Sequence, residues 1–129
     1  MAGMLPQSAG ITYGAKTGSD TLIVFFAGLG GNSPHIKFQF VDSAKAQIDD
    51  VNRLFVRDVE KCWYQRGAPP SSHTLSDMCT GIKHYIAETG ASKVVFVGSS
   101  MGGFAAILCS SLLGIGSAIA FSPQTFVGP

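Results

Sequence analysis

The sequence predicts an α/β fold, with a mostly parallel sheet and helices on both faces. Two apolar runs of strand length, at 21–26 and 93–97, are typical of strands that are covered on both sides, and a further strand is expected at 117–121. Two segments with apolar residues at helical spacing, 75–86 and 104–113, alternate with these runs. Such alternation implies right-handed strand–helix–strand crossovers, and therefore a parallel sheet.

The first 50 residues contain one strong strand and several weaker elements. Residues 11–13 are expected to form a short edge strand and 21–26 a buried strand. A flexible, glycine-rich loop follows at 27–34. Residues 36–41 alternate apolar and polar side chains and are expected to form either a strand or an irregular segment, and a short helix is expected at 43–50.

The clearest elements follow. A strand is expected at 52–58, and a polar, aromatic loop at 59–70. The next helix can be capped by Thr74 or Ser76 at its start and by Gly90 at its end. Its apolar face consists of Leu75, Met78, Cys79, Ile82, Tyr85 and Ile86.

Composition and charge narrow the class of protein. The 129 residues suffice for one domain, and a hydrophobic content of 46% can bury a core, unlike that of a disordered chain. The net charge is +1, and the sequence has no block of lysine or arginine. Charge therefore argues against nucleic acid or an anionic membrane as a partner.

The sequence is expected to be that of a cytoplasmic protein. It contains no apolar run as long as a membrane span, and residues 1–20 lack the regions of a secretory signal. The three cysteines, Cys62, Cys79 and Cys109, have no metal-ligand spacing and are interpreted as ordinary core thiols. No metal or organic cofactor is expected.

The chemistry is expected at a turn between a strand and the helix that follows it. Gly98-Ser99-Ser100-Met101-Gly102 matches the G-x-S-x-G pattern in this context, where the pattern is informative. A sharp turn forces the central serine into a strained backbone conformation and exposes its hydroxyl. We therefore predict Ser100, rather than Ser99, as a nucleophile. Gly98 and Gly102 would let the strand and the helix approach closely.

The same turn is expected to supply half of an oxyanion hole. The backbone N–H of Met101 would lie at a helix N-terminus, where donors are unpaired and the dipole favours negative charge. The second donor is expected from the glycine-rich loop after the first apolar strand. The N–H of Leu29 is the first choice and that of Gly28 the second.

Together these features resemble the α/β-hydrolase superfamily. The resemblance rests on three segments in that family's order, 21–31, 94–103 and 118–125, and extends from about residue 21 to the end. It implies a sheet of the α/β-hydrolase type and a serine esterase or lipase-like activity. The serine would attack an ester, thioester or related carbonyl of a small acyl substrate and form an acyl-enzyme.

The family's order of catalytic residues is incomplete here. In that family an acid and then a histidine follow the serine, but no Asp, Glu or His follows Ser100. His35, His73 and His84 all precede it. We therefore expect the family's C-terminal strands to be missing from this sequence. The acid and the base would lie beyond Pro129, or a partner chain would complete the sheet. This chain alone is expected to be inactive.

Two other classes of function remain open. A non-catalytic module could keep the fold as a binding or scaffolding surface. A nucleotide-binding doubly wound domain would use the glycine-rich loop for phosphate, although that loop lacks a third glycine at the required offset. Asp58 ends a strand where open sheets bind ligands, but turn formation is its default interpretation. Trp63 and Tyr64 would line a pocket or cover the core.

Overall fold

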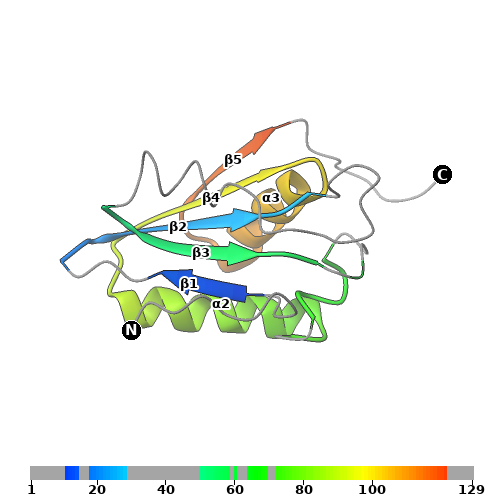
Figure 1. Ribbon diagram of the computed structural model, residues 1–129, viewed down its shortest axis with the longest axis horizontal. Coiled ribbons are helices and arrows are strands. Elements are labelled where there is room, and N and C mark those ends of the chain that lie inside the picture. The colour runs from blue at the N-terminus through cyan, green and yellow to red at the C-terminus, as the bar shows by residue number, and fades with distance from the viewer. Residues whose placement is uncertain are drawn as a thin grey trace.

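The computed structural model describes residues 11–14, 18–28, 50–58, 60, 64–69 and 72–121. Within these ranges the chain forms a five-stranded sheet and two helices (Figure 1). The segments at 36–41 and 43–50, for which a strand and a helix were considered, lie outside the described residues. No helix in the described part is long and apolar enough to cross a membrane.

The sheet confirms the predicted mostly parallel arrangement. Its strands are β1 (Ile11–Gly14), β2 (Thr21–Phe26), β3 (Asn52–Val56), β4 (Lys93–Ser99) and β5 (Ser117–Phe121), in the spatial order β1-β3-β2-β4-β5. β1 is an antiparallel edge strand, and the other four strands run parallel to one another. Their carboxyl ends therefore gather at one end of the sheet (Figure 1).

Two strand boundaries differ from the prediction. β4 continues two residues further than expected, because Gly98 and Ser99 still pair with β5 opposite Ala120 and Phe121. β3 ends two residues earlier, before Asp58. Both differences lie at the carboxyl end of the sheet, where contacts between strands and loops decide the boundary.

The first helix, α2 (Leu75–Thr89), has the caps that its sequence predicts. The Thr74 hydroxyl accepts a hydrogen bond from the N–H of Asp77 at 3.0 Å, and Gly90 ends the helix in the left-handed conformation, at φ 66°. The second helix, α3 (Met101–Leu113), begins three residues earlier than expected. Glycine is a poor helix former, so the sequence around Gly102 and Gly103 did not predict the first turn of α3.

The two described helices pack on one face of the sheet, and the described residues include no helix on the opposite face, where the sequence predicts helices as well. The sulfur atoms of Cys79 on α2 and Cys109 on α3 lie 3.8 Å apart. Both residues belong to a single buried cluster with Val24, Leu54 and Phe96, which pair side by side on three strands. On the opposite face Phe25 and Phe55 are also buried and stack at 5.1 Å. The central strands are therefore covered on both sides, as their continuous apolar sequences predict.

The core thiols behave as the sequence predicts for the described cysteines. Cys79 and Cys109 are free and buried, whereas Cys62 lies outside the described residues. The hydrogen bond between the two thiols lowers the pKa of Cys79 to about 7 and raises that of Cys109. Their first role is to fill the space between α2 and α3.

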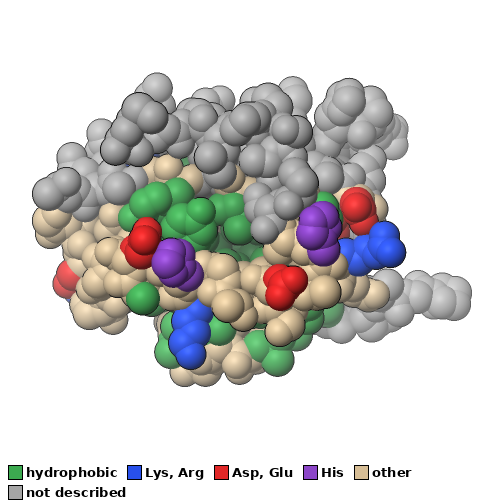
Figure 2. All heavy atoms as spheres, turned by 90° about the horizontal axis from the view of Figure 1, so that it is seen from below, with side chains coloured by type: hydrophobic (Ala, Val, Ile, Leu, Met, Phe, Trp, Pro, Cys, Tyr) green, Lys and Arg blue, Asp and Glu red, His purple; other side chains and the backbone are tan. Residues whose placement is uncertain are grey.

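The exposed side of α2 carries charges of both signs. Figure 2, seen from the side on which α2 lies in Figure 1, shows acidic, basic and histidine side chains interspersed among neutral ones. Two of these side chains, His84 and Glu88, lie 3.3 Å apart. Among the described residues on this side, positive charge is therefore not concentrated in the way that binding to a polyanion requires.

Gly81 provides a stability prediction within α2. A Cβ atom added there would meet no other atom within 4 Å, and the residue is helical. We expect Gly81→Ala to raise the free energy of unfolding by about 0.5–1 kcal/mol, because alanine loses less backbone entropy than glycine in a helix. Urea unfolding followed by circular dichroism would measure the change, and a decrease would contradict the open space around Gly81.

Candidate functional site

Ser100 occupies a strained turn between β4 and α3. Its backbone has φ 53° and ψ −120°, a conformation that residues other than glycine rarely adopt. Its N–H donates to the carbonyl of Phe121 at 2.8 Å, and its carbonyl accepts from the N–H of Phe104 at 3.1 Å. The sheet on one side and the helix on the other therefore hold Ser100 in this conformation. Its side chain forms no capping hydrogen bond with α3.

Glycines on both sides of Ser100 allow the backbones to approach. A Cβ atom at Gly98 would overlap the carbonyl group of Gly102, and a Cβ atom at Gly102 would overlap the carbonyl oxygen of Phe26. The first turn of α3 thus lies directly against the end of β2. This contact is the physical reason for small residues at both positions of the motif.

The start of the glycine-rich loop lies beside the serine turn. A Cβ atom at Gly28 would be 2.7 Å from the carbonyl oxygen of Ser99 and 3.6 Å from the Cβ of Ser100. Met101 is the first residue of α3 and is fully buried, so its N–H belongs to the N-terminus of this helix. Leu29, the first choice for the second oxyanion donor, lies outside the described residues.

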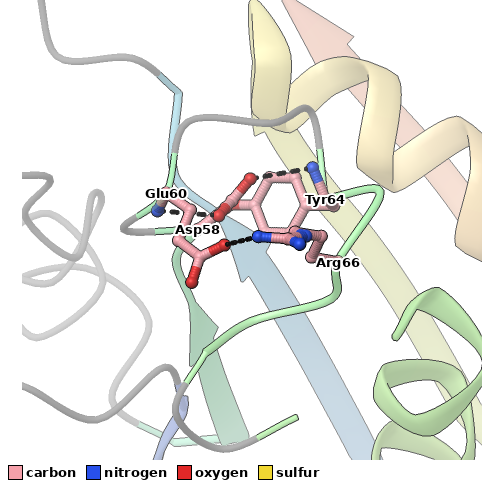
Figure 3. Close-up of polar contacts among 4 residues, drawn as sticks. All are labelled: Asp58, Glu60, Tyr64 and Arg66. Atoms are coloured by element: carbon pink, nitrogen blue, oxygen red, sulfur yellow. Dashed lines mark hydrogen bonds and ion pairs between the residues drawn. The ribbon is translucent and has the colours of Figure 1, made fainter. Parts of the chain in front are cut away.

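Asp58 forms a turn, as its default interpretation predicts. Its side chain is fully buried, and its two carboxylate oxygens accept hydrogen bonds from the N–H of Glu60 at 2.9 Å and of Tyr64 at 3.0 Å (Figure 3). An exposed ion pair between Glu60 and Arg66, at 3.2 Å, spans the same loop. Exposed pairs contribute little to stability, so the buried carboxylate is the main organiser of this turn.

Tyr64 connects this loop to the site, a role that the sequence did not indicate. The ring is fully buried and packs edge-to-face on Phe26, with ring centroids 5.4 Å apart. Its hydroxyl donates to the carbonyl of Ala27 at 2.7 Å. Burial, with a further contribution from Asp58, raises the pKa of Tyr64 well above its ordinary value of 10.0, so the phenol stays protonated. Trp63 lies outside the described residues.

The described histidines are exposed. His73 precedes α2, and His84 lies on the outer face of that helix, paired with Glu88. His35 lies outside the described residues. Within the described ranges, no group of three His, Cys, Asp or Glu side chains could hold a metal ion.

The site thus lies at the carboxyl end of a mostly parallel sheet, where open α/β sheets place their ligands. It combines a strained serine, the N-terminus of the helix after it, and a loop from the neighbouring strand β2. Fold and site together define an α/β protein with a serine turn between strand β4 and helix α3.

Comparison with known proteins identifies structures that share this fold. No protein-family model matches the chain, and no curated protein matches its sequence. The capsule O-acetyltransferase of Neisseria meningitidis serogroup A is similar in structure, with a TM-score of 0.66 and 17% identity, over 89% of this chain and 48% of that one. Its complex with caged gadolinium gives a TM-score of 0.65 at 17% identity, over 89% and 49% of the two chains.

A third similar structure is a histidine-to-alanine mutant of that enzyme in complex with CoA. Its TM-score is 0.68 at 17% identity, over 89% of this chain and 48% of that one. The chain therefore spans about half the length of the acetyltransferase structures that it matches, and it shares the fold of that half.

Proposed function

We propose that this chain provides the nucleophile of a serine-dependent enzyme of the α/β-hydrolase type, which cleaves an ester, thioester or related acyl bond. The observation that carries the proposal is the conformation of Ser100, with φ 53° and ψ −120° between β4 and α3. Backbone strain at a non-glycine residue persists only where the surrounding structure enforces it, and it gathers at functional sites. The absence of a capping bond leaves the hydroxyl available for chemistry rather than for helix stability.

The proposed reaction begins with attack of the Ser100 oxygen on the acyl carbon. The hydroxyl proton passes to a general base and then to the departing alkoxide or thiolate, while the acyl group stays on the serine. Water next attacks the acyl-enzyme and gives a proton to the base, which passes it to the Ser100 oxygen as the bond to the acyl group breaks and the acid is released. The N–H of Met101 and an N–H of the loop at Gly28 or Leu29 would stabilise the negative oxygen of each tetrahedral intermediate.

We assign the acid and the base of this reaction to residues outside the part of the chain that the structure describes. The exposed positions of His73 and His84 favour neither of them for the task. A serine without a base is a weak nucleophile at neutral pH. The proposal therefore concerns the whole natural protein in which this sequence occurs, with the histidine and the acid in a further segment or in a partner chain.

The outer edge of β5 supports such a continuation of the sheet. Ile119 and Phe121 lie on the same face of this strand, and their side chains are 48% and 54% exposed. Exposed apolar residues on a strand edge favour pairing with another strand. We propose that a further strand covers this edge in the complete enzyme.

Transfer of the acyl group to a hydroxyl compound is a second candidate reaction. It is favoured by the similarity in fold to a capsule O-acetyltransferase, one structure of which is a complex with CoA. The acyl-enzyme on Ser100 would be the same, and an alcohol would replace water as the acceptor. CoA thioester and a hydroxyl compound would then be the two substrates.

A cytoplasmic location is part of the proposal. Its support is the pair of free thiols, Cys79 and Cys109, with sulfur atoms 3.8 Å apart. Thiols in contact stay reduced in the cytosol, whereas oxidising compartments favour disulfides.

Covalent labelling tests the proposed function. A fluorophosphonate should react with the natural protein, and peptide mapping by mass spectrometry should place the adduct on Ser100, with Ser76→Ala, on the exposed side of α2, labelled normally. An adduct that persists in Ser100→Ala would contradict the assignment. A protein that takes no label would favour the binding or scaffolding module, and saturable binding of ATP or NAD would favour the nucleotide-binding domain.

A further inference from the structure

Tyr64 lies at the meeting point of two loops, although no catalytic pattern in the sequence includes it. In the described ranges, Tyr64 and Ser100 are the two residues other than glycine with positive φ, at 60° and 53°. Both contact the same short segment. The Tyr64 hydroxyl bonds to the carbonyl of Ala27, and Ser100 lies against Gly28. Strain on both sides of one segment indicates that its position matters.

The conformation of Tyr64 is maintained by Asp58. One carboxylate oxygen accepts from the N–H of Tyr64 at 3.0 Å, and the other accepts from the N–H of Glu60 at 2.9 Å (Figure 3). Charge-assisted hydrogen bonds of this kind are stronger than neutral ones, and both groups at the Asp58–Tyr64 contact are buried. The turn therefore fixes the backbone of Tyr64 and directs the ring towards the end of β2.

The Tyr64 hydroxyl lies 2.7 Å from the carbonyl oxygen of Ala27 and 3.3 Å from that of Val56, so its main acceptor is the peptide group between Ala27 and Gly28. The N–H of Ala27 donates to the carbonyl of Val56 at 2.9 Å, and the carbonyl of Ala27 accepts from Tyr64 at 2.7 Å, so both sides of Ala27 are held. The carbonyl of Ala27 and the N–H of Gly28 belong to the same planar peptide group and point in opposite directions when it is trans. A hydrogen bond to that carbonyl therefore sets the direction of the Gly28 N–H.

We infer that Tyr64 is a positioning residue for the peptide between Ala27 and Gly28, whose N–H is a candidate oxyanion donor, and that Asp58 keeps Tyr64 in place. This inference rests on the proposed function. The phenol, which stays protonated because of its burial, orients the Ala27–Gly28 peptide against the serine turn. A displacement of about 1 Å at such a position can lower a rate about 100-fold.

The test compares Tyr64→Phe with Tyr85→Phe in the full natural protein. The first change removes the hydroxyl and keeps the ring, and the second makes the same change on α2, where Tyr85 is partly exposed and packs against Tyr13 with the two rings tilted. We expect Tyr64→Phe to lower kcat for p-nitrophenyl acetate and the rate of fluorophosphonate labelling about 10- to 100-fold. KM should change less than about twofold, because the expected loss is confined to the transition state. Tyr85→Phe should leave both rates unchanged.

The outcomes separate this inference from the proposed function. Labelling and hydrolysis that survive in Ser100→Ala would overturn the function itself. A protein that needs Ser100 but reacts at the full rate as Tyr64→Phe, while folded by circular dichroism, would overturn the positioning role alone. If Tyr64→Phe does not fold, Asp58→Asn provides the second variant, because it weakens the support of Tyr64 and keeps the hydroxyl. We expect a roughly fivefold lower kcat for it, and an unchanged kcat would reject the inference.

Discussion

Ser100→Ala is expected to lower the hydrolysis of p-nitrophenyl acetate by the full natural protein at least about 10³-fold, with little change in stability. The large effect follows because the acyl-enzyme cannot form without the hydroxyl, and the remaining groups of a serine enzyme give only weak catalysis. The small effect on stability follows because the Ser100 side chain forms no capping bond with α3. Steady-state kinetics and thermal unfolding would measure the two quantities separately.

Ser100→Gly extends this prediction, because the strain and the chemistry of the residue then change together. Glycine adopts positive φ without steric cost, so we expect this variant to be inactive and about 1 kcal/mol more stable than the natural protein. Ser76→Ala on the exposed side of α2 is the control for handling and purity, with normal activity. An inactive but destabilised Ser100→Gly would show that the turn conformation is not strained, and would remove the main support for the site.

The fold was predictable where local sequence determines structure. β2 matches its apolar run at both ends, and α2 lies between the predicted caps Thr74 and Gly90. The start of α3 was not predictable in the same way. Gly102 and Gly103 disfavour a helix locally, and only the contact of Gly102 with Phe26 explains why the helix includes them. Tertiary packing overrides helix propensity at this position.

The candidate site was predictable only in part for a related reason. Ser100 was apparent because strand, serine and helix are contiguous in the sequence, so one pattern contains the whole turn. Tyr64 was not apparent, because its partner Ala27 is 37 positions away and the contact involves a backbone carbonyl, which any residue carries. The positive φ of Tyr64 has no sequence signal either, since it depends on the buried carboxylate of Asp58.

Gly102→Ala is expected to destabilise the protein by more than about 3 kcal/mol, although the same substitution at Gly81 should stabilise it. At Gly102 the added Cβ would overlap the carbonyl oxygen of Phe26 and lie 3.0 Å from the carbonyl carbon of Ala27, so α3 would have to move away from β2. Backbone atoms cannot change rotamer to make room, which makes this overpacking more costly than that of a side chain. At Gly81 no atom lies within 4 Å of the new Cβ.

Urea unfolding of Gly102→Ala and Gly81→Ala gives the two free energies under identical conditions, and their opposite signs are the expected result. A loss below about 1 kcal/mol at Gly102 would mean that α3 can separate from β2 at small cost. The close approach of helix and strand would then not enforce the conformation of Ser100. Because the peptide after Phe26 leads into Gly28, a rigid contact at Gly102 also fixes the loop beside the serine. Stability at Gly102 and reactivity at Ser100 should therefore fall together.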